Sequence, residues 1–149
     1  MERFDWNRLN SLQLGSYAEY FVKMEFTLYG FDVYTSEVDD RGIDFVIRRG
    51  CDRYYDIQVK SVYKAKYIFF PKHKFELREN LFAAVVIFTD REFPKLFLIK
   101  ATAWQEVNAL VVSRDYEMKK SKPEWGLNLS QKNHDLLSKY AFEKVVSTL

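Results

Sequence analysis

The sequence lacks several features that mark secreted and membrane-spanning proteins. Cysteine occurs once in 149 residues, at Cys51, so no disulfide can form within the chain. The longest apolar run, LFAAVVIF from Leu81, is far shorter than the roughly 20 residues that span a bilayer. The start MERFDWNRLN has no apolar core of the kind found in secretory signals. We therefore expect a cytoplasmic protein that does not enter a membrane.

A strong charge of one sign is also missing. The net charge of +2 is too small to indicate a nucleic-acid partner. A small total can still hide basic residues gathered on one side of the molecule. A chain of 149 residues, 48% hydrophobic, is long enough to bury one core, so we expect a single domain over residues 1–149. The aromatic content of 17% indicates a core built from large rings rather than a base-stacking surface.

Hydrophobic periodicity predicts the order of the main elements. Apolar residues recur at helical spacing from Ser11 to Tyr29, and Gly30 follows where a helix commonly stops. Alternating or continuous apolar segments come next and predict strands, and a closing helix is expected over 130–146. The expected strands cover 31–37, 43–49, 53–62, 81–90 and 95–101.

The remaining segments are expected to connect these elements. A short helix is expected to start near Thr102, and the charged segment RDYEMKKSKPEWG, with Pro123 and Gly126, predicts a loop or flexible arm. The order is then helix, three strands, a connection, two strands and a helix. This order predicts an α/β sandwich around one mixed sheet.

Polar residues stand at the ends of two neighbouring expected strands. Gln58 and Lys60 share one face of the third strand, because alternate residues of a strand point to the same side. If the turn between the strands has three loop residues, Arg49 pairs with Arg53, and Asp44 lies opposite Gln58 and diagonal to Lys60. A carboxylate, an amide and an ammonium would then converge within one side-chain length.

This group has a simpler interpretation. Asp44 and Lys60 could form a salt bridge on a solvated sheet face, worth roughly 0 to 1 kcal/mol. Against it, Asp44 lies within the continuous apolar run 43–47, which is typical of a strand covered on both faces.

The first expected helix supplies a further candidate. Glu19 lies beside the apolar stripe of the helix, and Gly15, one turn earlier, leaves open backbone next to it. An ordinary pair between Glu19 and Lys23 at i, i+4 is the alternative, and the helix alone favours it.

These residues together resemble the PD-(D/E)xK nuclease superfamily. The resemblance rests on Glu19 in GSYAEYFVK, Asp44 in DDRGIDFVI and the segment DIQVKS at 56–61. In layout it is nearest to Holliday junction resolvases, and it covers residues 11 to about 100. It implies an α/β fold, an αβββ-(α)-ββ restriction-endonuclease-like core whose mixed sheet is flanked by helices and completed by a C-terminal closing helix.

The resemblance also implies a chemistry, metal-dependent hydrolysis of phosphodiester bonds. Asp44 and Gln58 would hold Mg²⁺ or Mn²⁺, helped by the backbone carbonyl of Val59. Lys60 would orient or activate the attacking water, and Glu19 would assist with metal or water. A cation that neutralises phosphate charge and lowers the pKa of water is what this hydrolysis needs.

Two positions depart from the superfamily pattern. The usual proline before the aspartate is Ile43, a change that touches no chemistry. The second acid is Gln58, whose amide oxygen can coordinate a hard cation but brings no negative charge. Asp56, on the same strand face, is a candidate to compensate for that charge.

Basic residues follow the third expected strand. With interleaved aromatic residues they could form an edge that contacts phosphates, and the alternative is a solvated edge strand guarded by lysines. His73, His134 and Cys51 have no matching partner set and are interpreted as structural or surface residues. The nucleic-acid candidates are Lys64, Lys66, Lys72, Lys74 and Arg48.

The sequence supports two hypotheses from different classes. The first is a Mg²⁺-dependent endonuclease that acts on nucleic acid, with DNA the expected substrate, and that forms a homodimer because paired cuts in a duplex need two sites. The second is a noncatalytic module on the same fold that binds nucleic acid or protein, with Gln58 marking a decayed metal site.

Overall fold

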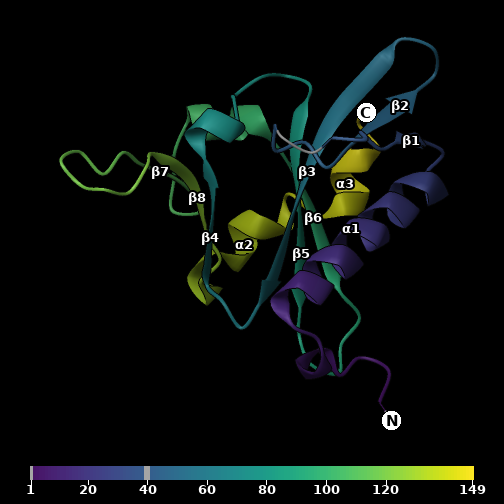
Figure 1. Cartoon of the computed structure of the whole chain (residues 1–149), viewed down its shortest axis with the longest axis horizontal. Helices are drawn as coiled ribbons and strands as arrows, with labels where there is room; N and C mark the ends of the chain where they lie inside the picture. Colours follow the sequence, from purple (N-terminus) through teal and green to yellow (C-terminus); the bar gives the residue numbers. More distant parts are fainter. Residues whose placement is uncertain (1, 39–40) are drawn as a thin grey trace.

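The computed structural model describes residues 2–38 and 41–149 (Figure 1). Helix α1 (Ser11–Leu28) begins at the predicted residue, ends one residue before the predicted end, and starts with a capping box. Asn10 accepts a hydrogen bond from the Gln13 backbone N–H (2.8 Å), and the Gln13 side chain accepts one from the Asn10 N–H (2.9 Å). Gly30, at φ 88°, follows the helix in the left-handed region, as expected for a residue that ends one.

All five predicted strands form one mixed sheet in the order β1-β2-β3-β5-β6. β3 and β5 are parallel, and the other neighbours are antiparallel. The mixed sheet of the predicted fold class is therefore confirmed. Its strands are β1 (Asp32–Tyr34), β2 (Phe45–Arg49), β3 (Arg53–Tyr63), β5 (Leu81–Phe88) and β6 (Lys95–Lys100).

A second sheet was not predicted from the sequence. It consists of β4 (Tyr67–Pro71), β7 (Val111–Arg114) and β8 (Glu124–Asn128) in the order β4-β8-β7. The prediction of a loop over RDYEMKKSKPEWG was wrong at its C-terminal end, where β8 begins. Gly126 belongs in this strand because a Cβ there would collide with the Tyr67 ring, so the glycine permits close packing instead of a turn.

The connections also differ from the predicted ones. Between β3 and β5 the chain forms β4 and a 3-10 turn, η2 (Lys72–Lys74), where the expected order allowed a helix. The short helix near Thr102 is a 3-10 helix, η3 (Ala101–Gln105). β4 belongs to the second sheet, and Trp104 of η3 packs in the apolar cluster with Phe70 of β4, so this sheet supplies the cover that a helix would otherwise provide.

The prediction of one continuous closing helix over 130–146 was wrong. The segment forms three short pieces, because the Tyr140 carbonyl accepts a hydrogen bond from the Leu98 N–H (2.8 Å) and Ala141 forms a bridge with Phe97. Pairing with β6 therefore interrupts the helical pattern. The pieces are η4 (Gln131–Asn133), α2 (His134–Ser138) and α3 (Phe142–Val146).

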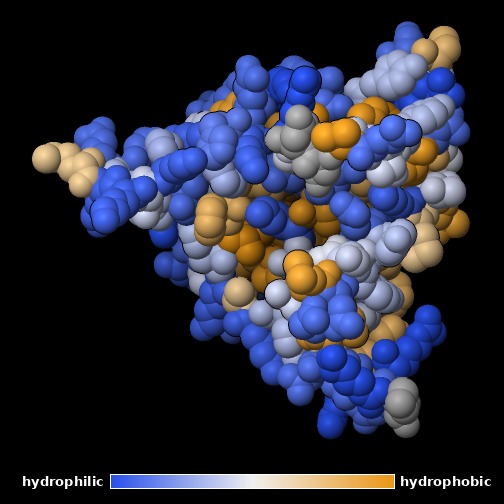
Figure 2. Space-filling model, viewed as in Figure 1, coloured by the Kyte–Doolittle hydropathy of each residue, from blue (hydrophilic) through white to orange (hydrophobic). Residues whose placement is uncertain are grey.

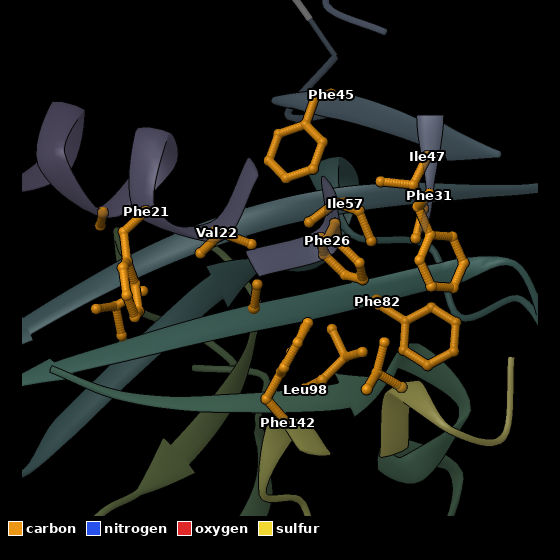
Figure 3. Packing of buried hydrophobic residues seen from close by; sticks show 14 of the residues in the cluster. Phe21, Val22, Phe26, Phe31, Phe45, Ile47, Ile57, Phe82, Leu98 and Phe142 are labelled. Carbon is orange, nitrogen blue, oxygen red and sulfur yellow. The ribbon is translucent and has the colours of Figure 1, made fainter. Parts of the chain in front are cut away.

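The five-stranded sheet is covered on both faces. On one face α1 and α3 pack together, with the rings of Phe26 and Phe142 5.0 Å apart, and Figure 3 shows the side chains of this cluster pointing toward one another. On the other face a second cluster, which includes Phe70, Phe75 and Trp104, lies under the second sheet. In Figure 1 the second sheet lies on the left, α1 on the right, and β3 and β5 between them. None of the helices in the described ranges combines the length and apolar character needed to cross a membrane.

Candidate active site

The predicted register of the β2–β3 hairpin is confirmed. Arg49 pairs with Arg53 and Phe45 with Ile57, which brings Asp44, directly before β2, opposite Gln58. The Asp44 N–H donates to the carbonyl of Ile57 (2.9 Å), the partner of Phe45, which holds the residue before β2 against β3. Asp44 and Gln58 therefore share the sheet face that looks toward the second sheet.

The two strands open into a cavity of about 330 Å³ between the hairpin and the connection after β4. Figure 2 shows this side of the molecule hollowed between the second sheet and α1, with hydrophobic side chains in its floor. The cavity brings together three of the four predicted catalytic residues and one of the predicted phosphate-binding lysines. It is lined by Gly42, Asp44, Gln58, Val59, Lys60, Pro71 and Lys74.

Asp44 is held by the backbone of the neighbouring strand. Its Oδ2 accepts a hydrogen bond from the Val59 N–H at 2.6 Å, and the residue is partly buried. A charge-assisted bond this short restrains the carboxylate at the cavity wall.

Gln58 carries a polar atom that the protein leaves unsatisfied. The residue is 8% exposed, and its Oε1 is buried without a hydrogen-bond partner. Gly42, at φ 77°, lies against it: a Cβ at this position would stand 3.7 Å from Oε1 and 3.1 Å from the Lys74 carbonyl. An unpaired buried acceptor costs roughly 1–3 kcal/mol, so this oxygen is poised to bind a cation or a donor.

Lys60 is a partly buried cation of the cavity. Burial lowers the pKa of its ammonium, Lys74 lowers it further, and the attraction of Asp44 opposes the shift without cancelling it. Nζ lies 5.5 Å from the ring centroid of Phe70 and 6.0 Å from that of Phe69. The lysine therefore stands in an apolar, ring-lined setting where loss of its proton is easier than in water.

Glu19 is not among the described residues that line the cavity. It lies partly buried on α1, one helical turn before Lys23, whose ammonium is 5.5 Å from the ring centroid of Phe45. Glu19 is thus on the part of α1 that faces the start of β2, outside the group formed by Asp44, Gln58 and Lys60.

Asp56 shares the strand face of Gln58 but is engaged elsewhere. Its carboxylate forms an ion pair with Arg78 at 2.6 Å. Asp56 and Arg78 line a second cavity of about 510 Å³, which shares Lys74 with the first. The carboxylate is therefore neutralised beside the candidate site instead of replacing the missing second acid.

The predicted nucleic-acid residues are in different environments. Lys72 pairs with Asp115 (2.7 Å) and lies 3.9 Å from the ring centroid of Trp125, so it supports the second sheet. Lys74 alone among the five candidates lines the cavity, and Lys66 is exposed. Lys64 is 3.8 Å from Asp90, and Arg48 is 3.0 Å from Asp32.

Two residues of the site were missed at the level of the sequence. Pro71 and Gly42 form walls of the cavity without carrying reactive groups. Gly42 precedes Asp44 by two residues, and a glycine beside a candidate strand acid is a usable sign of close approach. Pro71 gives no such sign, because it reaches the cavity only through the pairing of β4 with β8.

The oxygen atoms of the cavity match a hard divalent cation better than a soft one. The available donors are the Asp44 carboxylate, the Gln58 amide oxygen and the Val59 carbonyl, all oxygens, which Mg²⁺ and Mn²⁺ prefer. Within the described residues no group of three or more His, Cys, Asp or Glu side chains could hold a metal. The donor set therefore fits a cation that keeps several water ligands.

Comparison with models of protein families finds no match, and neither does comparison with curated protein sequences. A solved structure is similar: Hjc, a Holliday junction resolvase from the archaeal hyperthermophile Archaeoglobus fulgidus. The TM-score is 0.57 at 14% sequence identity, and the match covers 89% of this chain and 95% of that chain. The likeness shows that the chain has a nuclease-like fold of the resolvase type.

Proposed function

We propose that the chain is a metal-dependent endonuclease that hydrolyses phosphodiester bonds in nucleic acid, with DNA the expected substrate. The observation that carries the proposal is the convergence of the Asp44 carboxylate, the unsatisfied Gln58 Oε1 and the partly buried Lys60 ammonium in one cavity. Each of these groups is costly to bury in a merely structural role, and together they suit phosphodiester hydrolysis. The resolvase-like fold supports the same chemistry.

Asp44, Gln58 and the Val59 carbonyl are the groups proposed to hold Mg²⁺ or Mn²⁺. When bound, the ion would neutralise charge on the phosphate and lower the pKa of a bound water. Binding would also satisfy Gln58 Oε1, which has no hydrogen-bond partner in the structure. Glu19 stays in the proposal only as an acceptor that acts through water, because it does not line the cavity.

Lys60 is proposed to orient the attacking water and to exchange a proton with it. Its lowered pKa makes the neutral amine more accessible near neutral pH than that of an exposed lysine. Lys60 and Asp44 line the same cavity, and the attacking water is proposed to lie between them. Lys74, on the opposite wall, is proposed to contact the phosphate.

The wider proposals concern partners and setting. Lys66 and Lys74 are the stronger candidates for phosphate contact, because Lys64, Lys72 and Arg48 already lie near acidic side chains. A homodimer is proposed because one site cuts one strand, and a cytoplasmic setting is proposed from the single free cysteine, Cys51.

A noncatalytic nucleic-acid-binding module is the second candidate. It is favoured by one observation: among the residues that the structure describes, the cavity is lined by one carboxylate, Asp44, and by two ammonium groups, Lys60 and Lys74. Such a cavity can attract a phosphate without any metal.

One set of assays separates the two candidates. Purified protein is incubated with supercoiled plasmid, branched DNA, single-stranded DNA and RNA, in Mg²⁺, in Mn²⁺ or with a chelator, and metal binding is followed by calorimetry. We expect metal-dependent nicking of at least one DNA substrate and a calorimetric site that is lost in Asp44→Asn. Binding of nucleic acid with neither cleavage nor a metal site would favour the noncatalytic module.

A further inference from the structure

Phe69 is an exposed aromatic ring at the border of the candidate site. It is 47% exposed, and its ring centroid lies 6.0 Å from the Lys60 ammonium. Its strand, β4, is at the end of the order β4-β8-β7, and Figure 1 shows it as the strand of the second sheet nearest to β3. The ring therefore stands on a sheet edge beside the hollow.

The backbone under this ring is fixed from both sides. Phe70, the next residue, is fully buried and stacked on Phe75 with centroids 4.5 Å apart. On the outer face Phe69 pairs with Gly126, which has no side chain, and Tyr67 donates a hydrogen bond to Glu124 at 2.5 Å. The strand thus presents a ring of which nearly half stays in water, and that exposed part costs hydration free energy.

An exposed phenylalanine is unremarkable by itself, and its distance from Lys60 is what gives it meaning. Each nucleotide joins a charged phosphate to a flat base through one sugar, so the two groups lie close together. An ammonium beside an aromatic ring matches both parts, since the cation attracts the phosphate and the ring stacks on the base. Phe69 and Lys60 supply this pair of groups.

We propose that Phe69 is a stacking platform for the base of the nucleotide whose phosphate lies at Lys60. The inference rests on the proposed function, and it narrows the substrate class. A base within a duplex is already stacked on both sides, so it must be unpaired or extruded to reach the ring. The expected substrate is therefore nucleic acid with an unpaired nucleotide at the position of reaction.

The test is a binding cycle with single-stranded DNA that carries one abasic position, moved along the strand nucleotide by nucleotide. Affinity is measured in the Asp44→Asn background so that the DNA stays intact. Phe69→Ala is expected to weaken binding about five- to a hundredfold. An abasic site at the stacking position should weaken binding to the Phe69 protein by a similar factor and leave the Phe69→Ala protein unaffected.

Two variants control the cycle. Phe93→Ala removes another exposed ring, 57% exposed, whose contacts are with Phe4 and Phe21, and it should leave affinity unchanged. Phe69→Tyr keeps a ring and should keep both the affinity and the response to the abasic site.

The outcomes distinguish this inference from the proposed function. Unchanged affinity in Phe69→Ala would overturn the stacking role. So would losses of binding free energy from Phe69→Ala and from the abasic site that are additive at every position. Cleavage by the wild type would still support the nuclease in either case. An abasic effect that depends on Phe69 at one position, in a protein that never cleaves, would support stacking and reject the nuclease. A wild-type protein that binds no nucleic acid would reject both.

Discussion

The two faces of β3 belong to one strand and have opposite chemistry. Ile57 and Val59 point toward α1 into a cluster of apolar side chains. Gln58 and Lys60 point toward the second sheet, where Gln58 is as well covered as a core residue but has an unsatisfied oxygen. Both faces are covered, so burial alone does not separate them. What separates them is whether the buried atoms find partners.

This difference indicates which face serves stability and which serves function. Packing of apolar atoms stabilises the fold, whereas an unpaired amide oxygen and a desolvated ammonium oppose folding. Such unfavourable groups persist where they supply chemistry. Substitutions on the two faces should therefore change different quantities, which gives a series of tests.

Asp44→Asn should have the largest effect. It removes the only carboxylate that lines the cavity within the described residues, and we expect cleavage to fall about a thousandfold or more with the fold retained. The matched control is Asp56→Asn, which alters an acid on the same sheet face that is paired with Arg78 and should leave most activity. Equal losses in the two variants would show that the cavity is not the reaction centre.

Ile57→Ala should change stability instead of cleavage. Ile57 is fully buried under α1, so truncation is expected to lower the free energy of unfolding by about 2–5 kcal/mol, measured by urea denaturation. Cleavage per folded molecule should change little. A loss of activity without a loss of stability would mean that the two faces are not separate in function.

Lys60→Met should lower cleavage about a hundredfold and make the protein more stable. Because burial lowers the folded-state pKa of Lys60, its protonated form opposes folding, and this penalty is complete at pH values below the folded pKa. The penalty fades as pH rises from the folded pKa toward the unfolded value of 10.5.

The stability gain of Lys60→Met over wild type should therefore be greatest near neutral pH and shrink in alkali. Thermal unfolding in chelator at several pH values measures this dependence. A variant less stable than wild type near neutral pH would instead favour a structural ion pair with Asp44.

Gln58→Leu should also raise stability, by a smaller amount than Lys60→Met. It replaces the unsatisfied Oε1 with apolar atoms of similar size, and the free energy of unfolding is expected to rise by about 1 kcal/mol. Affinity for Mg²⁺ or Mn²⁺, followed by calorimetry, should fall at the same time. Unaltered metal affinity would remove Gln58 from the proposed ligand set.

The salt dependence of DNA binding should show the smallest effect. Replacing Lys66 and Lys74 by Gln should flatten the plot of log affinity against log salt by about one unit for each lost phosphate contact. The same change at Lys64 and Lys72, which lie near Asp90 and Asp115, should flatten it less. Identical slopes in both double variants would mean that the nearby acids do not matter.

Elements with a local signal could be predicted from the sequence. Helix α1 has an apolar stripe and a stop at Gly30, and the β2–β3 register follows from the length of the turn at Gly50. That register was enough to place Asp44 opposite Gln58. The polar residues of the site, Asp44, Gln58 and Lys60, therefore come from the β2–β3 hairpin and the residue directly before it.

The second sheet could not be predicted in this way, because its strands form for reasons remote in sequence. β8 contains Gly126, which reads as a turn residue until the Tyr67 ring is placed over it. Glu124 is 6% exposed and is retained in a strand because Tyr67 donates to it. The closing helix failed for the same kind of reason, since pairing of Tyr140 with Leu98 outweighs a helical pattern.

The cavity wall formed by Pro71 determines when, during folding, the candidate site becomes enclosed. Pro71 pairs with Glu124, and the Lys72 N–H donates to the Pro123 carbonyl (3.0 Å), so this side of the cavity depends on residues far along the chain. Contacts of long sequence separation form slowly, because closing the long loop between them costs entropy. A nascent chain that has exposed only α1 and the β2–β3 hairpin would already carry Asp44, Gln58 and Lys60, yet it would lack the enclosure that desolvates them. Reactivity would then arrive only after Pro123 and Glu124 have joined the fold.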